Sequence, residues 1–250
     1  MAKKARTRQP LPPPLPPETR TVGQLVAETI NLYRRNFWPS LALGLGPAIA
    51  AVGLTLVSGP WTLAFGFTAF ALLMTASYLG AVVVATGERP ERRALLVGAA
   101  AGYIVFVPAL FLYSLFILPA VLWLALLGLS LPAAVIERVG FRRALRRGYQ
   151  LARGDYVHAA GSLATLTIVA FLTSTVLFFL LRSGSESELA VAAFLSLLVI
   201  SPILFLGAAL LYFDQAARDP TRRSDADVHH ADQPDRPGRA DAEGEPRPSA

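Results

Sequence analysis

The sequence predicts an all-α, polytopic membrane protein with six transmembrane helices. Composition supports this, because 54% of the 250 residues are hydrophobic and only 16% are charged. Distribution supports it further, because the charged residues leave long stretches of the chain without any charge. An uncharged apolar run of about 18 residues or more is long enough to cross, as a helix, a hydrocarbon layer about 30 Å thick.

The uncharged stretches accommodate six crossings. Residues 38–87 and 94–136 are each too long for one crossing, since a helix rises about 1.5 Å per residue, and each suits two. The turn "SGP" at residues 58–60 divides the first stretch, and Pro119 is the best candidate for dividing the second. The expected spans are residues 38–57, 61–85, 94–117, 120–136, 157–181 and 189–213.

Lysine and arginine side chains gather on one side of these spans. Seven precede residue 38, three lie between the second and third spans, six lie between the fourth and fifth, and six follow the last. Only Arg182 lies on the other side. Because short loops rich in Lys and Arg stay in the cytoplasm, both termini are expected to be cytoplasmic.

The two ends of the chain are expected to be disordered. Residues 1–20 include "PLPPPLPP", which favours polyproline conformations and cannot build a core. Residues 220–250 are polar, of mixed charge and rich in Pro, Gly and Ala. The membrane domain is therefore expected to cover residues 21–219.

A basic amphipathic helix is expected at residues 138–154, between the fourth and fifth spans. One face carries apolar or small residues at spacings of three and four, and the other carries arginines. Such a helix can lie in the membrane interface, with its apolar face toward acyl chains and its arginines toward lipid phosphates. The arginines are Arg142, Arg143, Arg146, Arg147 and Arg153.

A second interfacial helix is expected at residues 21–37, before the first span. Its apolar stripe includes Leu25, Ile30 and Tyr33, and Thr21 with Gln24 fits a capping box. Arg34 and Arg35 lie near its end. These two arginines and the five of residues 138–154 are the candidate contacts for anionic lipid headgroups or for a protein partner. The alternative is that all of them only set the topology.

Three carboxylates at the ends of spans are candidates for structural polar contacts. They are Glu137, Asp155 and Asp214. We expect Asp214, at the exit of the last span, to pair with an arginine of the basic helix and so to fix that helix against the span.

Gly98 and Gly102 form a Gly-xxx-Gly pair in the third span. Such a pair allows two helices to approach closely. It could serve an internal helix pair or a homo-oligomer, and internal packing is the preferred interpretation.

The residues offer little for catalysis, for a metal or for a cofactor. Cysteine is absent, so a thiol nucleophile and a thiolate metal site are excluded. No ionisable residue lies deep in any expected span, where an intramembrane enzyme or a proton-coupled carrier would need one. We therefore expect no catalytic, metal or cofactor site. Nucleic acid is not an expected partner either, because the basic helix has one aromatic residue, Tyr149, and adjoins lipid.

A transporter or exporter is the alternative function. Prolines interrupt four expected spans, at Pro47, Pro108, Pro132 and Pro202. Broken helices could line a path for a small or lipid-like substrate. Proline is also common as a simple kink in membrane helices, and that interpretation is preferred.

The segment around the basic helix also carries a family resemblance. It reads "IERVGFRRALRRGYQLARGDYVHAAG" and resembles the signature of the glycerophosphoryl diester phosphodiesterase membrane-domain family and its uncharacterised bacterial relatives. "VGQLVAETINLYRRNF" resembles the family's opening helix, and "LLYFDQAARDP" resembles its closing motif. The sequence departs from the family pattern at Gly148–Tyr149, where Ser-Trp is typical, and at Gln215–Ala216. The matching positions are Glu137, Gly140, Ala144, Leu145, Arg147, Tyr149, Leu151, Arg153, Gly154, Leu211, Tyr212 and Asp214.

The resemblance implies a fold more than an activity. In the family's name-giving proteins, a membrane unit is joined to a catalytic phosphodiesterase barrel, and we expect no such barrel in this chain. The expectation is an accessory or organising domain of the bacterial cytoplasmic membrane, with no catalytic site of its own. It would touch anionic lipid or a protein partner through its basic helices.

Overall fold

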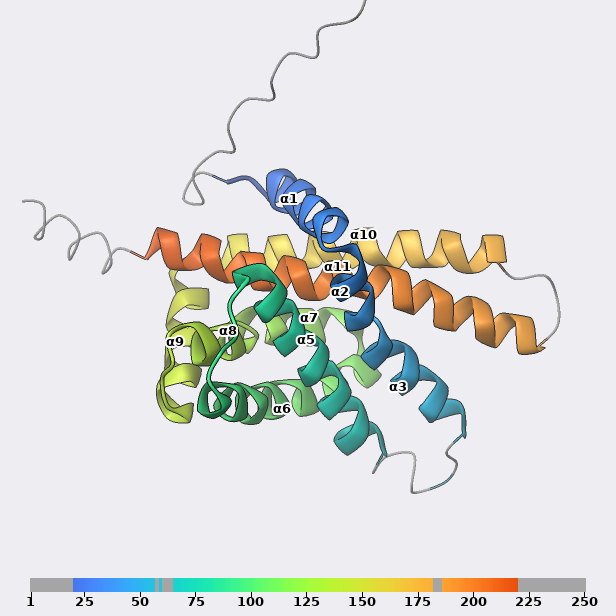
Figure 1. Ribbon diagram of the computed structural model, residues 1–250, viewed down its shortest axis with the longest axis horizontal. Coiled ribbons are helices and arrows are strands. Elements are labelled where there is room, and N and C mark those ends of the chain that lie inside the picture. The colour runs from blue at the N-terminus through green and yellow to red at the C-terminus, as the bar shows by residue number, and fades with distance from the viewer. Residues whose placement is uncertain (1–19, 57–58, 60–64, 182–185, 220–250) are drawn as a thin grey trace, which may run out of the picture. The chain divides into compact units, whose positions relative to one another are not determined.

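The computed structural model describes residues 20–56, 59, 65–181 and 186–219 (Figure 1). Every regular element in these ranges is a helix, which confirms the predicted all-α fold. The elements are α1 (Val22–Arg35), α2 (Phe37–Leu43), α3 (Leu45–Leu56), the π-helical turn η2 (Gly66–Phe70), α5 (Ala71–Thr86), α6 (Arg92–Leu115), α7 (Ile117–Leu127), α8 (Ser130–Ile136), α9 (Phe141–Gly154), α10 (Tyr156–Leu181) and α11 (Glu186–Arg218).

Six helical segments of the described chain are long and apolar enough to cross a membrane, as predicted. The first combines α2 with α3, and the fourth combines α7 with α8. The last is longer than predicted, because α11 continues to Arg218. The segments are Phe37–Leu54, Thr68–Thr86, Arg92–Leu115, Ile117–Ile136, Tyr156–Leu180 and Glu188–Arg218.

The turns between spans agree only in part with the prediction. Gly59 has a φ of 68°, in the left-handed region that favours glycine, and the rest of the turn predicted at residues 58–60 lies outside the described residues. The turn predicted at Pro119 lies instead at Phe116, whose extended backbone (φ −160°, ψ 151°) separates α6 from α7. Pro119 is in the first turn of α7, where a missing backbone N–H breaks no helical hydrogen bond.

The predicted terminal segments fall mostly outside the described residues. Residues 1–19 and 220–250 are not among them, so the expected disorder there stays a prediction. Arg20 is described, and it forms an ion pair with the last helix.

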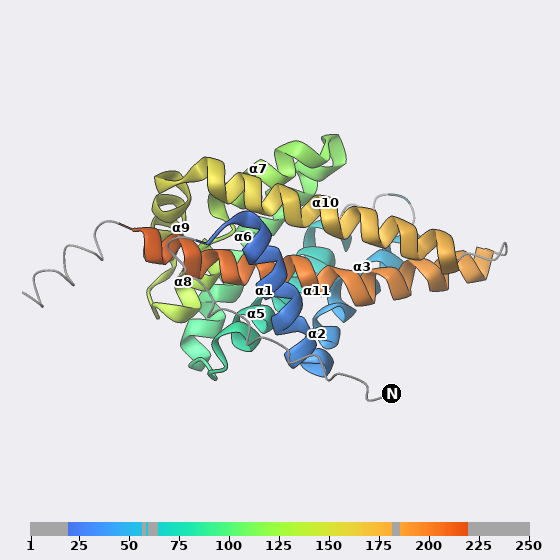
Figure 2. The ribbon, with the colours of Figure 1, turned by 90° about the horizontal axis from the view of Figure 1, so that it is seen from above.

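Helix α11 is the element against which most of the others pack. It lies beside α10 along much of its length (Figures 1 and 2) and also contacts α1, α2, α3, α5 and α9. Leu206 and Leu211 of α11 are almost completely buried, as is Leu166 of α10. Gly207 lets the two helices approach, because a Cβ atom there would lie 2.5 Å from a methyl group of Leu166.

Glycines of α6 also serve internal packing. A Cβ atom at Gly98 would lie 2.7 Å from the Val135 side chain of α8, and one at Gly102 would lie 2.6 Å from Thr75 of α5. Both glycines are buried. The preferred interpretation of the Gly-xxx-Gly pair is therefore confirmed, and this face of α6 is occupied within the chain.

Two of the proline interruptions are matched by specific neighbours. Pro202 has no backbone N–H, so it cannot donate to the Leu198 carbonyl one turn earlier in α11. Gly44, at the junction of α2 and α3, packs against that carbonyl so closely that a Cβ atom at position 44 would not fit. In α6, the Trp123 indole donates to the Val105 carbonyl at 2.9 Å, in the turn before Pro108. For Pro202, a neighbouring helix thus covers the carbonyl that has no helical donor, as membrane helices require.

Candidate functional site

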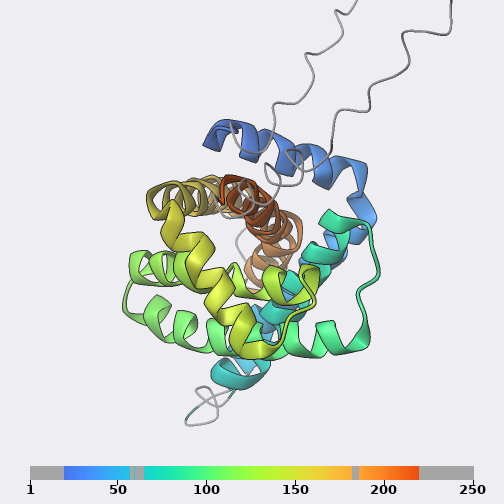
Figure 3. The ribbon, with the colours of Figure 1, turned by 90° about the vertical axis from the view of Figure 1, so that its left-hand side faces the viewer.

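The basic helix α9 is packed against the other helices by its small residues. Its buried side is formed by Ala144, Gly148, Leu151 and Ala152, and it contacts α6, α7, α8 and α11. Figure 3 shows α9 crossing in front of α6 and α7. At Gly148 the backbone contacts Ser130 so closely that a Cβ atom would not fit.

This packing corrects one expectation from the sequence. The apolar face of α9 was expected to face acyl chains, but it is buried against protein. The physical reason is the size of the residues on that face, because Ala and Gly let the backbones of two helices approach. The amphipathic helix itself is confirmed.

The predicted arginine contacts of α9 divide into two groups. Arg142, Arg143, Arg146 and Arg153 are exposed, and none forms an ion pair with another described residue. We call these four the arginine face. Arg147 is half-buried and its Nε lies 2.9 Å from Glu137 Oε1. Its role within the described chain is therefore structural.

Helix α1 also packs against protein. Leu25 is fully buried in a cluster with Leu211 and Tyr212 of α11, and the predicted capping box of Thr21 and Gln24 is present. Ile30, which was expected on the apolar stripe, is exposed instead, while Thr29 is buried. Arg34 and Arg35 are exposed in the last turn, where the negative end of the helix dipole favours cations.

Glu137 joins three helices. It caps the end of α8, and its Oε1 accepts a hydrogen bond from Arg147 of α9 at 2.9 Å and from the Tyr212 hydroxyl of α11 at 2.8 Å. The basic helix is thus connected to the last span, as the sequence suggested. The connection runs through Tyr212 and not through Asp214.

Asp214 has a different partner from the one predicted. Its side chain is completely buried, and its Oδ1 accepts from Arg20, at 2.8 Å, just before α1. The expected arginine of α9 is not its partner, because Asp214 lies on the side of α11 that α1 approaches. Sequence reasoning missed Arg20, which lies 194 positions away and within the segment predicted to be disordered.

Asp155 completes the polar contacts. Its Oδ1 accepts from the His158 backbone at 3.3 Å, at the start of α10, and its Oδ2 lies 2.9 Å from Arg218 at the end of α11. Arg218 also donates to the Arg20 carbonyl at 2.8 Å. The three predicted carboxylates therefore all make structural contacts, and they connect α1, α8, α9, α10 and α11 near the chain's most basic segments.

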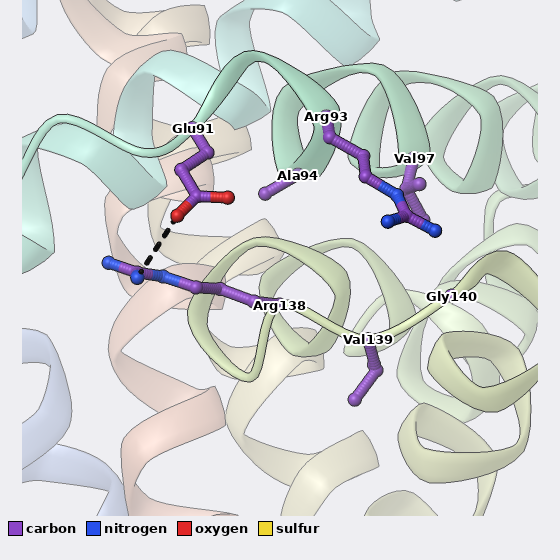
Figure 4. A pocket seen from close by; sticks show the side chains of 7 residues that line it. All are labelled: Glu91, Arg93, Ala94, Val97, Arg138, Val139 and Gly140. Carbon is purple, nitrogen blue, oxygen red and sulfur yellow. Dashed lines mark hydrogen bonds and ion pairs between the residues drawn. The ribbon is translucent and has the colours of Figure 1, made fainter.

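A pocket of about 170 Å³ lies between the start of α6 and the linker from α8 to α9, which begins at Glu137 (Figure 4). Arg138 of that linker has a φ of 52°, which is unusual for a residue other than glycine, and its guanidinium lies 3.4 Å from Glu91. Sequence reasoning missed the pocket, because its charged residues come from the start of α6 and from the α8–α9 linker, which are distant in sequence. Its lining is Glu91, Arg93, Ala94, Val97, Arg138, Val139 and Gly140.

The described residues contain no group of three or more His, Cys, Asp or Glu side chains that could hold a metal ion. They do contain several arginine side chains on packed helices at the ends of spans. This arrangement can bind anionic groups by charge and hydrogen bonding.

We expect Asp214→Asn to lower the free energy of unfolding by roughly 3 kcal/mol, because it leaves the Arg20 charge largely buried without its counter-ion. Arg20→Gln should have a similar effect. The double variant should be less destabilised than the sum of the two, with a coupling energy above about 1 kcal/mol. Reversible unfolding in mixed micelles measures all three.

Arg34→Gln is the matched control, since it removes an exposed arginine of α1 that has no ion pair among the described residues. It should change stability by less than about 0.5 kcal/mol. Additive effects of the Arg20 and Asp214 substitutions would show that the ion pair does not hold α1 against α11.

Comparison with known proteins adds no relative: no protein-family model, no curated protein and no solved structure matches this chain. The resemblance of the basic helix to a phosphodiesterase membrane domain stays a prediction.

Proposed function

We propose that this chain is a membrane domain without a catalytic site of its own, and that its arginine face holds anionic lipid headgroups. The observation that carries the proposal is the packing of α9. Because its small residues are buried against α8, the four arginines of the face must point away from the helices that bind it.

The energetics favour lipid as the partner of this face. An arginine near an anionic membrane surface contributes about 1 kcal/mol, so four fixed together can contribute roughly 4 kcal/mol. The helix that carries them is already held by the Glu137 contacts with Arg147 and Tyr212. Binding therefore orders side chains but no backbone, which lowers its entropic cost.

We further propose that the arginine-rich ends of the spans lie on the cytoplasmic side of a bacterial plasma membrane. The distribution of 23 Lys and Arg residues along the chain supports this orientation. The family resemblance supports the bacterial setting.

The orientation predicts that a reporter active only in the cytoplasm will be active when fused after Ala250. The same reporter inserted after Gly184, between the fifth and sixth spans, should be inactive, because six spans place that loop on the opposite side. The reverse pattern would contradict the orientation, and activity at both positions would contradict the number of spans.

Transport of a small or lipid-like substrate is a second candidate. One observation favours it: the first span is interrupted at Gly44, and this break lies against Leu198 of the last span, one turn before Pro202, where α11 itself continues. Transporters use such interruptions near the middle of the membrane. Flux of a substrate through vesicles containing the purified protein would support this candidate over a purely organising role.

The lipid role predicts the effect of removing the arginine face. In the variant with Arg142, Arg143, Arg146 and Arg153 all changed to Gln, the enrichment of phosphatidylglycerol over phosphatidylcholine around the protein should fall roughly fivefold, a loss of about 1 kcal/mol per bound lipid. Lipid retained by protein purified from equimolar vesicles measures the ratio. High salt should reduce the enrichment of the unmodified protein in the same direction.

A matched control changes four arginines of the C-terminal segment, Arg222, Arg223, Arg236 and Arg239, to Gln. This variant has the same net charge as the arginine-face variant and should keep most of the enrichment. An equal fall in both variants would show that only net charge matters. No fall in either would remove anionic lipid as the partner and leave a protein partner for these arginines.

A further inference from the structure

We infer that the pocket between α6 and the α8–α9 linker binds the phosphate group of one membrane phospholipid. The inference rests on the proposed function, since it requires the domain to hold phospholipid. The inference goes beyond the proposed function because it names one binding site, and none of the residues of that site belongs to the arginine face. We call this site the Arg93–Arg138 pocket.

The charges of the pocket fit one phosphodiester. Figure 4 shows the Arg93 side chain extending from α6 beside Val97, on one side of the pocket, and the Arg138 side chain extending to the other side, toward Glu91. Arg93 forms no ion pair with any described residue. With Arg138 and Glu91 the pocket carries a net charge of +1, which is opposite to the single negative charge of a phosphodiester.

The existing ion pair in the pocket is weak enough to yield to a ligand. Arg138 lies 3.4 Å from Glu91, and the two side chains are 57% and 65% exposed. An exposed pair of this kind contributes little to stability, because water screens the two charges. A phosphate in the pocket can accept hydrogen bonds from Arg93 and, once the Arg138 side chain turns from Glu91 toward the pocket, from Arg138 as well.

The backbone at the pocket adds donors. Gly140 lines the pocket and precedes the first turn of α9, and no side chain caps the amide groups of that turn. Free N–H groups at the start of a helix favour an anion. This contribution supplements the two arginines and does not define the site by itself.

The position of the pocket favours a lipid over free phosphate. Arg93 lies in the first turn of the span Arg92–Leu115, and Arg138 follows the span that ends at Ile136. The pocket is therefore at the level where spans end and lipid phosphates lie. Below it, α6 exposes an apolar stripe at helical spacing, with Leu96 at 72% and Ile104 at 48%. Acyl chains can follow this stripe while the phosphate occupies the pocket.

The test measures binding of short-chain phosphatidylglycerol to the purified full-length protein in a neutral detergent, by native mass spectrometry. The unmodified protein should bind one lipid more tightly than the rest. Arg93→Gln and Arg138→Gln should each weaken that binding about tenfold, because each removes a charge-assisted contact. Glu91→Gln should strengthen it about threefold, because it frees Arg138 and removes a competing negative charge.

Controls separate this site from the arginine face and from misfolding. Arg223→Gln, in the C-terminal segment, should bind like the unmodified protein. The four-arginine variant of α9 should keep the single tight lipid while losing general enrichment, so the two proposals can fail separately. Each variant should retain the helicity of the parent, and a variant that does not is replaced by the conservative Arg93→Lys or Arg138→Lys, which should bind with intermediate affinity.

Three results would overturn the inference. Unchanged binding in both Arg93→Gln and Arg138→Gln would remove the pocket as the site. Displacement of the lipid by an equal concentration of inorganic phosphate would show a site for free phosphate and not for lipid. Weaker binding in Glu91→Gln would show that Glu91 contributes an attractive contact, contrary to a site for an anionic phosphate alone.

Discussion

The close contact between α9 and α8 is the constraint on which the rest of the arginine-rich region depends. It requires a glycine at position 148, because Ser130 occupies the space of any side chain there. Once this contact is made, the orientation of α9 about its own axis is fixed. Arg147 then faces Glu137, and the arginine face points away from the helices beneath. In the proposed function, an anionic membrane surface is the partner of this cationic face.

The polar contacts follow from the same arrangement. Each of the three carboxylates has an arginine partner, and only Asp214 is completely buried. Burying its charge is costly unless the charge is paired and hydrogen-bonded. Removing either Asp214 or Arg20 therefore costs more than their pair contributes. The three contacts together connect α1, α9 and α11. Within the described residues, these three pairs lie at the ends of helices, while the span interiors bury apolar residues together with small polar ones such as Thr75 and Ser162.

The fold was largely predictable because hydropathy and charge act locally. The six spans and the periodicity of α9 follow from residues that are close in sequence. The partners of α9 and Asp214 could not be found in this way, because an apolar stripe has the same period whether it faces lipid or protein, and Arg20 is distant in sequence. The turn at Phe116 was missed because no glycine or charge marks it. The Arg93–Arg138 pocket was missed because the start of α6 and the α8–α9 linker, which are distant in sequence, must come together to form it.

The most direct test of the account is to ask what touches the small-residue face of α9 in a bilayer. The full-length protein is reconstituted with a phospholipid that carries a photoreactive diazirine on its acyl chain, and the adducts are located by mass spectrometry. Adducts are expected on exposed residues of α10 such as Phe171, and none on Ala144, Leu151 or Ala152. Adducts on those α9 residues at the frequency found for Phe171 would contradict it, because they would place the helix on lipid instead of on α8.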